Sequence, residues 1–176
     1  AADMNFLELS ENLLNNMTKS IFSGNINFVI LNLYLKNNKL NFINNVEINN
    51  DLTNNSLEAI PVKTSRYPNS VRIILKYNKI KYLTLDSFNL NFRFLEQLDL
   101  SYNKISIIEE NSFQYLNQLI ELNLSHNRIN KLKNNTFQSQ FNIWNLNLSF
   151  NKIQVLHFPL FRFLKYITSH TYFLTA

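Results

Sequence analysis

The sequence contains no cysteine, one glycine and three prolines among its 176 residues. Without cysteine the chain has no disulfide framework, no thiol nucleophile and no cysteine-ligated zinc or iron–sulfur cluster. The single glycine, Gly24, excludes a phosphate-binding loop, a dinucleotide-binding fingerprint and a nucleophile elbow, because each requires several glycines within a few residues. These absences remove most familiar classes of enzyme and predict that the chain uses no cofactor.

Long hydrophobic runs and leader features are also missing. No segment offers about 18 uninterrupted apolar residues, so we expect no membrane span in this chain. The first residues have neither a basic nor an apolar segment typical of a secretory signal, and they lack an initiator methionine. We therefore expect a processed product or a piece of a longer protein, with any signal, cap or anchor outside it. A hydrophobic content of 45% predicts a packed core.

The charge is unevenly distributed, with a formal net value of +5. No acidic residue lies between Glu58 and Asp86, although six cations do, and none follows Glu121. Such a bias favours contact with nucleic acid, heparin-like polymers or anionic membranes. The cations are nevertheless spaced singly rather than in runs, which is typical of an ordinary solvated face.

An internal repeat organises the chain. Asparagines between hydrophobic pairs recur at intervals of 26, 17, 23, 25, 24 and 24 residues, at Asn12, Asn38, Asn55, Asn78, Asn103, Asn127 and Asn151. Around the last three the text reads L-x-x-L-x-L-x-x-N-x-I-x-x-I/L, with Ile143 in place of the first leucine in the third. A phenylalanine follows ten residues after five of these asparagines, at Phe22, Phe88, Phe113, Phe137 and Phe161.

This pattern resembles the leucine-rich repeat family, in the roughly 24-residue form typical of extracellular proteins. The resemblance covers residues 1–176 as one domain of about seven repeats, is strongest over residues 70–164, and leaves an eroded eighth start at Ile167. It implies an α/β fold, a right-handed horseshoe solenoid with a concave parallel sheet and an irregular or short-helical convex side. The short spacing from Asn38 to Asn55 departs from the pattern, and we expect residues 61–68 to loop out.

The residue types make physical sense without the family. Apolar residues alternating at the end of L-x-x-L-x-L point to one face of a short strand, and stacked repeats join these strands over a continuous core. The asparagine turns the chain, and its amide both donates to and accepts from backbone groups of neighbouring turns. Its replacement by alanine should therefore cost about 1–3 kcal/mol. The phenylalanines are expected to stack as a second spine.

The residues just before four consecutive repeat asparagines are the first binding candidates, namely Tyr77, Tyr102, His126 and Phe150. Because stacked strands lie about 4.8 Å apart, these rings should form a column at the concave face. Such a column suits protein recognition, since aromatic rings supply rigid contact area. The alternative is that the rings only cover the turn. Arg72, Asp99 and Glu121 are outward residues of the same strands and complete the predicted protein-binding face.

A basic line follows the asparagines, at Lys39, Lys79, Lys104, Arg128 and Lys152, and should lie along one rim. Lysine is common at this position in the family. The alternative remains that the chain is a polyanion-binding module that uses this basic rim. The concave face itself mixes acidic, aromatic and amide residues without a stripe of cations. This mixture argues against binding of a nucleic-acid backbone there.

Five sequons for asparagine-linked glycosylation occur, at Asn16, Asn54, Asn123, Asn134 and Asn147. Asn134 falls in the variable convex segment, so it is the best candidate if the protein is secreted. Asn123 and Asn147 lie on neighbouring strands, where glycans would cover part of the concave face.

Catalysis finds no support in the pattern. The three histidines, His126, His157 and His170, fall at different phases of different repeats, which predicts neither a metal site nor a catalytic cluster. The one conceivable arrangement brings His126 near Asp99 and Glu121, where the carboxylates could tune a general base.

We interpret the chain as a non-catalytic protein-recognition module of an extracellular or cell-surface protein. The motif style is similar to invertebrate Toll-like or adhesion ectodomains, which implies a glycoprotein of receptor, innate-immunity or cell-adhesion type. An intracellular, cytoplasmic scaffold or regulator is the alternative that explains the missing cysteines. Extracellular members of the family usually carry cysteine-rich caps, so uncapped ends predict self-association in addition to binding of an unknown protein ligand.

Overall fold

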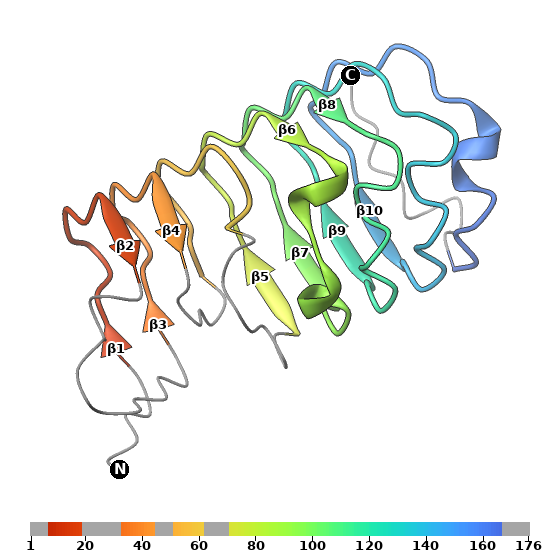
Figure 1. Ribbon diagram of the computed structural model, residues 1–176. Coiled ribbons are helices and arrows are strands. Elements are labelled where there is room, and N and C mark those ends of the chain that lie inside the picture. The colour runs from red at the N-terminus through yellow and green to blue at the C-terminus, as the bar shows by residue number, and fades with distance from the viewer. Residues whose placement is uncertain (1–6, 19–32, 45–50, 62–70, 167–176) are drawn as a thin grey trace.

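The computed structural model describes residues 7–18, 33–44, 51–61 and 71–166, and shows short strands in two rows along an elongated molecule (Figure 1). The first row contains β1 (Leu7–Glu8), β3 (Leu33–Tyr34), β5 (Arg72–Ile74), β7 (Gln97–Asp99), β9 (Glu121–Asn123) and β10 (Asn145–Asn147). The second row contains β2 (Asn16–Thr18), β4 (Phe42–Asn44), β6 (Tyr82–Leu83) and β8 (Ile107–Ile108). Among the described residues, short 3-10 helices lie between strands or after them, at η2 (Leu85–Ser87), η3 (Leu90–Phe92) and η4 (Phe158–Phe161).

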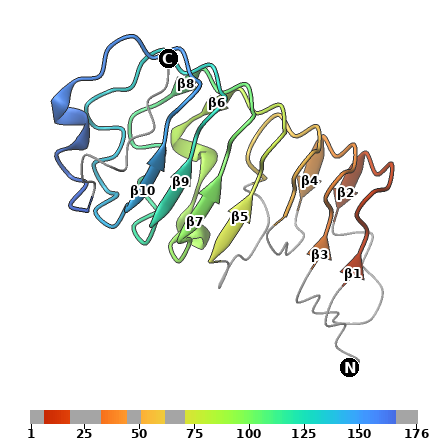
Figure 2. The same ribbon diagram turned by 180° about the vertical axis from the view of Figure 1, so that it is seen from behind.

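Every strand pair in the described ranges is parallel and joins strands of two successive repeats. The main sheet has the order β10-β9-β7-β5, and a parallel bridge from Asp51 to Ile74 extends it toward the N-terminus. In the main sheet each repeat contributes one strand, and equivalent positions of successive repeats lie opposite each other, with Leu98 opposite Leu122 and Leu122 opposite Leu146. Figure 2 shows the same rows from behind, with β5, β7, β9 and β10 side by side. The predicted repeat solenoid is confirmed, while its horseshoe curvature stays a prediction.

The repeat leucines and isoleucines form one continuous core. Leu98, Leu122 and Leu146 of the central strand positions are at most 2% exposed. Each side chain of this kind stabilises the folded chain by about 1.5–3 kcal/mol through burial. On the other side of the core the rings of Phe88 and Phe113 stack with centroids 6.0 Å apart, and those of Phe113 and Phe137 are 5.9 Å apart. The predicted phenylalanine spine is therefore present in these three repeats.

The repeat asparagines form a ladder of hydrogen bonds. The Nδ2 group of Asn103 donates to the carbonyls of Leu100 and Ser101 in its own repeat and of Leu75 in the preceding one. Its Oδ1 atom accepts from the N–H of Ile80, also in the preceding repeat, at 3.1 Å. The same four bonds are made by Asn38, Asn55, Asn78, Asn127 and Asn151. The asparagine prediction is confirmed because each of these amides, of which only that of Asn151 is half-buried rather than buried, satisfies backbone groups of two turns.

The residue before each repeat asparagine has a left-handed backbone, which the sequence did not suggest. Seven non-glycine residues adopt φ between 53° and 59° here, namely Glu11, Asn37, Asn54, Tyr77, Tyr102, His126 and Phe150. The N–H groups of Tyr77, Tyr102 and His126 donate to the carbonyl of a residue in the following repeat, at 3.0–3.2 Å. The left-handed turn therefore aims these N–H groups along the axis of the solenoid and holds successive repeats together.

Three sequence expectations lie outside the described residues. They are the spine residue Phe22, the eighth start at Ile167, and residues 62–68 of the segment that was expected to loop out. Pro61, at the beginning of that segment, is described and buried.

Candidate protein-binding face

The four aromatic residues of the left-handed position form a stacked column beyond the carboxyl ends of the main strands. The centroids of Tyr77 and Tyr102 are 4.4 Å apart, those of Tyr102 and His126 are 4.0 Å apart, and those of His126 and Phe150 are 4.1 Å apart. Tyr77, Tyr102 and Phe150 are 37–53% exposed. The predicted aromatic column is therefore present, and its register follows from the parallel pairing of the strands beneath it.

The column presents ring edges to solvent because the faces of the rings cover one another. The edge of an aromatic ring carries the positive end of its quadrupole, and the two tyrosine hydroxyls can donate hydrogen bonds. Lys76 adds a full positive charge, with Nζ 5.0 Å from the ring centroid of Tyr77 and 5.1 Å from that of Tyr102. The exposed part of the column is thus suited to a partner rich in hydrogen-bond acceptors.

The outward side chains of the main sheet surround a shallow hollow of about 190 Å³. Its lining includes Arg72 from β5, Asp99 from β7 and Glu121 from β9. The structure therefore brings these three predicted binding residues together on one surface. Exposed polar groups and both signs of charge around a shallow hollow suit a protein surface better than a small enclosed ligand.

The carboxylate of Asp99 also has a structural role. Its Oδ1 atom accepts the N–H of Ser101 at 2.9 Å, and Asn123 and Asn147 accept the N–H two residues later in the same way. At the equivalent position of the first repeat, hydrogen bonds from the hydroxyl and the N–H of Ser10 lower the pKa of Glu8 below its ordinary value. This position therefore shapes the turn and leaves only part of each side chain to a ligand.

The five sequon asparagines differ in their surroundings. Asn134 is exposed in a turn between β9 and β10, and Asn16 and Asn54 are exposed as well. Asn123 and Asn147 are half-buried, and their Oδ1 atoms also accept the hydroxyls of Ser125 and Ser149 at 2.8 and 2.7 Å. The structure leaves Asn134 accessible, whereas the two sheet positions are engaged within the turn.

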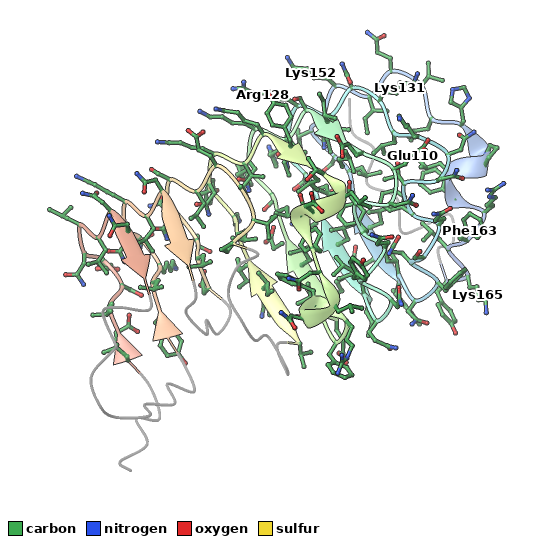
Figure 3. The ribbon with its side chains drawn as sticks, in the orientation of Figure 1. Glu110, Arg128, Lys131, Lys152, Phe163 and Lys165 are labelled. Atoms are coloured by element: carbon green, nitrogen blue, oxygen red, sulfur yellow. The ribbon has the colours of Figure 1, made fainter. Side chains whose placement is uncertain are left out.

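The basic residues that follow the asparagines lie along one rim. The N–H of each donates to a carbonyl of the preceding repeat, as in Lys104 to Ile80 at 2.9 Å and Arg128 to Ile105 at 2.8 Å. Figure 3 shows Arg128 and Lys152 on the same upper edge. Within the described part of the chain the ion pairs are Lys81–Glu58 and Lys133–Glu110, so the charges of this basic rim are not paired.

His126 is a member of the column and makes no hydrogen bond or ion pair with Asp99 or Glu121 in the residues the structure covers. Its ring packs between Tyr102 and Phe150 with interplanar angles of 12° on both sides. The conceivable arrangement of a general base with two carboxylates is therefore not assembled. No three His, Asp or Glu side chains of the described ranges are grouped as metal ligands.

Two groups of exposed residues were not found by sequence reasoning. Trp144 is 63% exposed just before β10, and its ring stacks on that of Tyr166 at 6.3 Å. Lys36 and Lys76 meet Arg72 around a second hollow. Trp144 could have been found from the sequence, because an apolar residue directly precedes the strand in each of the last two strand-bearing repeats, Ile120 before β9 and Trp144 before β10. For the second hollow the signal was that Lys36 and Lys76 both stand two residues before a repeat asparagine, whereas Arg72 stands at another position of its repeat.

The architecture defines a class, a solenoid of stacked repeats joined by parallel strands. The model of the family described as Leucine rich repeat matches residues 74–129 and again residues 93–153. No curated protein matches the chain. The chain belongs to the leucine-rich repeat family, whose domains generally mediate protein binding and are typically non-catalytic. Among the helices that the structure describes, none is long and apolar enough to cross a bilayer.

Proposed function

We propose that this chain is a non-catalytic, protein-binding part of an extracellular or cell-surface leucine-rich-repeat protein of receptor, innate-immunity or adhesion type. The observation that carries the proposal is the partly exposed column of Tyr77, Tyr102, His126 and Phe150 beside the hollowed sheet face. The general role of the family in protein binding agrees with it.

The column is not required by the turn it occupies. A left-handed backbone costs a residue with a side chain about 1–2 kcal/mol, and asparagine tolerates it better than an aromatic residue does. Two earlier repeats use Asn37 and Asn54 at the same position with the same φ. Ring stacking returns about 0.5–1.5 kcal/mol per pair, which only offsets the backbone cost. Aromatic residues here are therefore better explained by a binding role than by stability.

The test is a binding screen of the chain against secreted and cell-surface ectodomains, followed by affinity measurements on variants. The double variant Tyr102→Ala/His126→Ala should weaken a specific partner by about tenfold or more. Its thermal midpoint should stay close to that of the parent chain. Tyr82→Ala is the matched control, because Tyr82 is 53% exposed on β6 and lies outside the column. A partner that ignores the double variant would show that the rings only cover the turn.

The extracellular placement has a separate test. After passage through a eukaryotic secretory pathway, site-resolved mass spectrometry should find glycan on Asn134 and none on Asn123 or Asn147, which keeps the sheet face open. Glycan on either sheet asparagine would move the binding surface to the rims. Folded protein without any glycan would contradict the proposal and favour the cytoplasmic scaffold.

The unpaired basic rim supports a second candidate, the binding of a polyanion such as a sulfated polysaccharide. Reversal of two adjacent charges, Lys104→Glu with Arg128→Glu, would then abolish binding to immobilised heparin, and affinity would fall steeply with added salt. Unchanged retention of this double variant would remove the candidate.

A further inference from the structure

A second and wider hollow lies where the third repeat meets β5. It has a volume of about 650 Å³ and is open to solvent. Three cationic side chains line it, Lys36, Arg72 and Lys76, and we refer to it as the basic hollow. The remaining lining residues are Asn37, Thr53, Asn54, Ile74, Tyr77 and Asp99.

The cations of the basic hollow have no ion-pair partner among the residues that the structure describes. Lys36 and Arg72 are exposed, and Lys76 lies over the rings of Tyr77 and Tyr102. The only carboxylate in the lining is that of Asp99, and one of its oxygens accepts the N–H of Ser101. The hollow therefore carries an excess of positive charge that a ligand can satisfy.

The basic hollow is continuous with the aromatic column, because Tyr77 lines the hollow and is also the first ring of the column. A ligand anchored by its negative charge in the hollow can thus continue over the ring edges of Tyr102 and His126. An electropositive, donor-bearing surface of this kind complements carboxylates and backbone carbonyls, and not a plain apolar helix face.

The acidic residues of the sheet face favour an acidic peptide over a densely charged polyanion as the ligand of the basic hollow. Asp99 lines the hollow and Glu121 lies on β9, two strands from β5, and both carboxylates would repel a polymer that carries charge on every unit. A peptide with separated carboxylates can place them near the cations and present neutral groups elsewhere. The dense polymer would instead suit the basic rim, whose cations form no ion pair within the described ranges.

We propose that the basic hollow anchors an acidic, extended segment of a partner protein, whose neighbouring residues lie over the aromatic column. This inference rests on the proposed function and deepens it by assigning the chemistry of the partner and the residues that hold its charge. Lys36, Arg72 and Lys76 bind the carboxylates, and the column contributes contact area and hydrogen-bond donors.

The experiment uses the whole chain and a fluorescein-labelled peptide of alternating glutamate and alanine, with the matching glutamine peptide as the uncharged probe. Fluorescence anisotropy should show binding of the glutamate peptide only. The variant Lys36→Glu/Arg72→Glu should weaken it by about tenfold or more. The control Lys131→Glu/Lys165→Glu changes net charge equally but acts on exposed residues at the C-terminal end (Figure 3), so its effect should be small.

Two results of the anisotropy measurement would overturn the assignment. Equal weakening by both double variants would mean that the peptide responds only to net charge. Stronger weakening by Lys104→Glu/Arg128→Glu would move the anionic ligand to the basic rim. Carbodiimide coupling gives a second readout, because it joins carboxylates to amines in contact. Mass spectrometry should find the glutamate peptide on Lys36 or Lys76, and coupling elsewhere alone would contradict the proposal.

The two double variants distinguish a failure of this inference from a failure of the proposed function. If a partner from the ectodomain screen loses affinity with Tyr102→Ala/His126→Ala but ignores Lys36→Glu/Arg72→Glu, the basic hollow is wrong and the column stands. If the partner ignores both double variants, neither surface binds it. Circular dichroism of each variant confirms that an unchanged fold underlies the comparison.

Discussion

The described repeats before residue 62 and those after residue 70 use the same turn but differ in what they build on it. Asn55 in the first region and Asn127 in the second make the same four hydrogen bonds to backbone groups of two repeats. The residues before them, Asn54 and His126, have φ of 55° and 53°. The turn geometry therefore does not depend on the length of the repeat or on the side chain at the left-handed position.

The two regions differ in the phenylalanine spine and the aromatic column. Only 17 residues separate Asn38 from Asn55, without a spine phenylalanine, whereas the later repeats are 24 or 25 residues long and stack Phe88, Phe113 and Phe137. The match to the family model begins at residue 74, in the second region. The comparison teaches that the asparagine ladder and the buried leucines are common to both regions, and that the phenylalanine stack and the aromatic column are separate additions in the second region.

We expect the largest loss of stability from a substitution in the phenylalanine spine, which the short repeat lacks. Phe113→Ala removes a fully buried ring between two stacked neighbours and should lower the free energy of unfolding by about 3–5 kcal/mol. Urea denaturation followed by circular dichroism measures the loss. A loss below about 1 kcal/mol would show that the rings do not pack as one spine.

The next effect tests what the two regions share. Asn127→Ala and Asn55→Ala should each lower the free energy of unfolding by about 1–3 kcal/mol, because each change leaves buried backbone groups unpaired. Hydrogen exchange should accelerate at the N–H that each side chain accepts, Ile105 for Asn127 and Leu40 for Asn55. Loss in only one region would refute a common role of the ladder.

A smaller effect compares two serines at equivalent positions. The hydroxyl of Ser125 donates to Asn123 at 2.8 Å, whereas the buried hydroxyl of Ser101, in the repeat of Asp99, has no partner. Ser125→Ala should cost about 1 kcal/mol, and Ser101→Ala should be neutral or slightly stabilising. Urea denaturation of the two variants measures this difference in stability through the difference between their midpoints. Equal losses would mean that the two serines have the same surroundings.

We expect the smallest change in stability from a substitution that makes the second region resemble the first. Tyr102→Asn places at the left-handed position the residue that the earlier repeats use there. The gain in backbone energy and the loss of ring stacking should nearly cancel, so stability should change by less than about 1 kcal/mol. Thermal denaturation checks this balance. A loss well above that value would show that the column stabilises the fold, and would weaken the case for a binding role.

The strands and the core were predictable because the repeat signature has both a fixed length and a fixed alternation. The pattern around Asn103 and Asn127 predicted the inward leucines, the asparagine bonds and the phenylalanine stack. The column was also predictable, because parallel pairing in register places equal positions of successive repeats side by side. Prediction was weaker where repeats have unequal length. Lys36 and Lys76 each stand two residues before a repeat asparagine, and periodicity relates these two cations. Arg72 stands six residues before Asn78, so no periodicity relates it to them.

The amino-acid sequence by itself determined the period of the chain, the inward and outward faces of its strands and the absence of cysteine chemistry. These properties follow from the spacing and type of residues within one repeat. The tertiary structure alone decided the left-handed backbone at Tyr102 and its equivalents, and the meeting of Arg72 with Lys36 and Lys76 around one hollow. These depend on how one repeat is placed on the next, because the hydrogen bonds and ring contacts that set them are made between repeats.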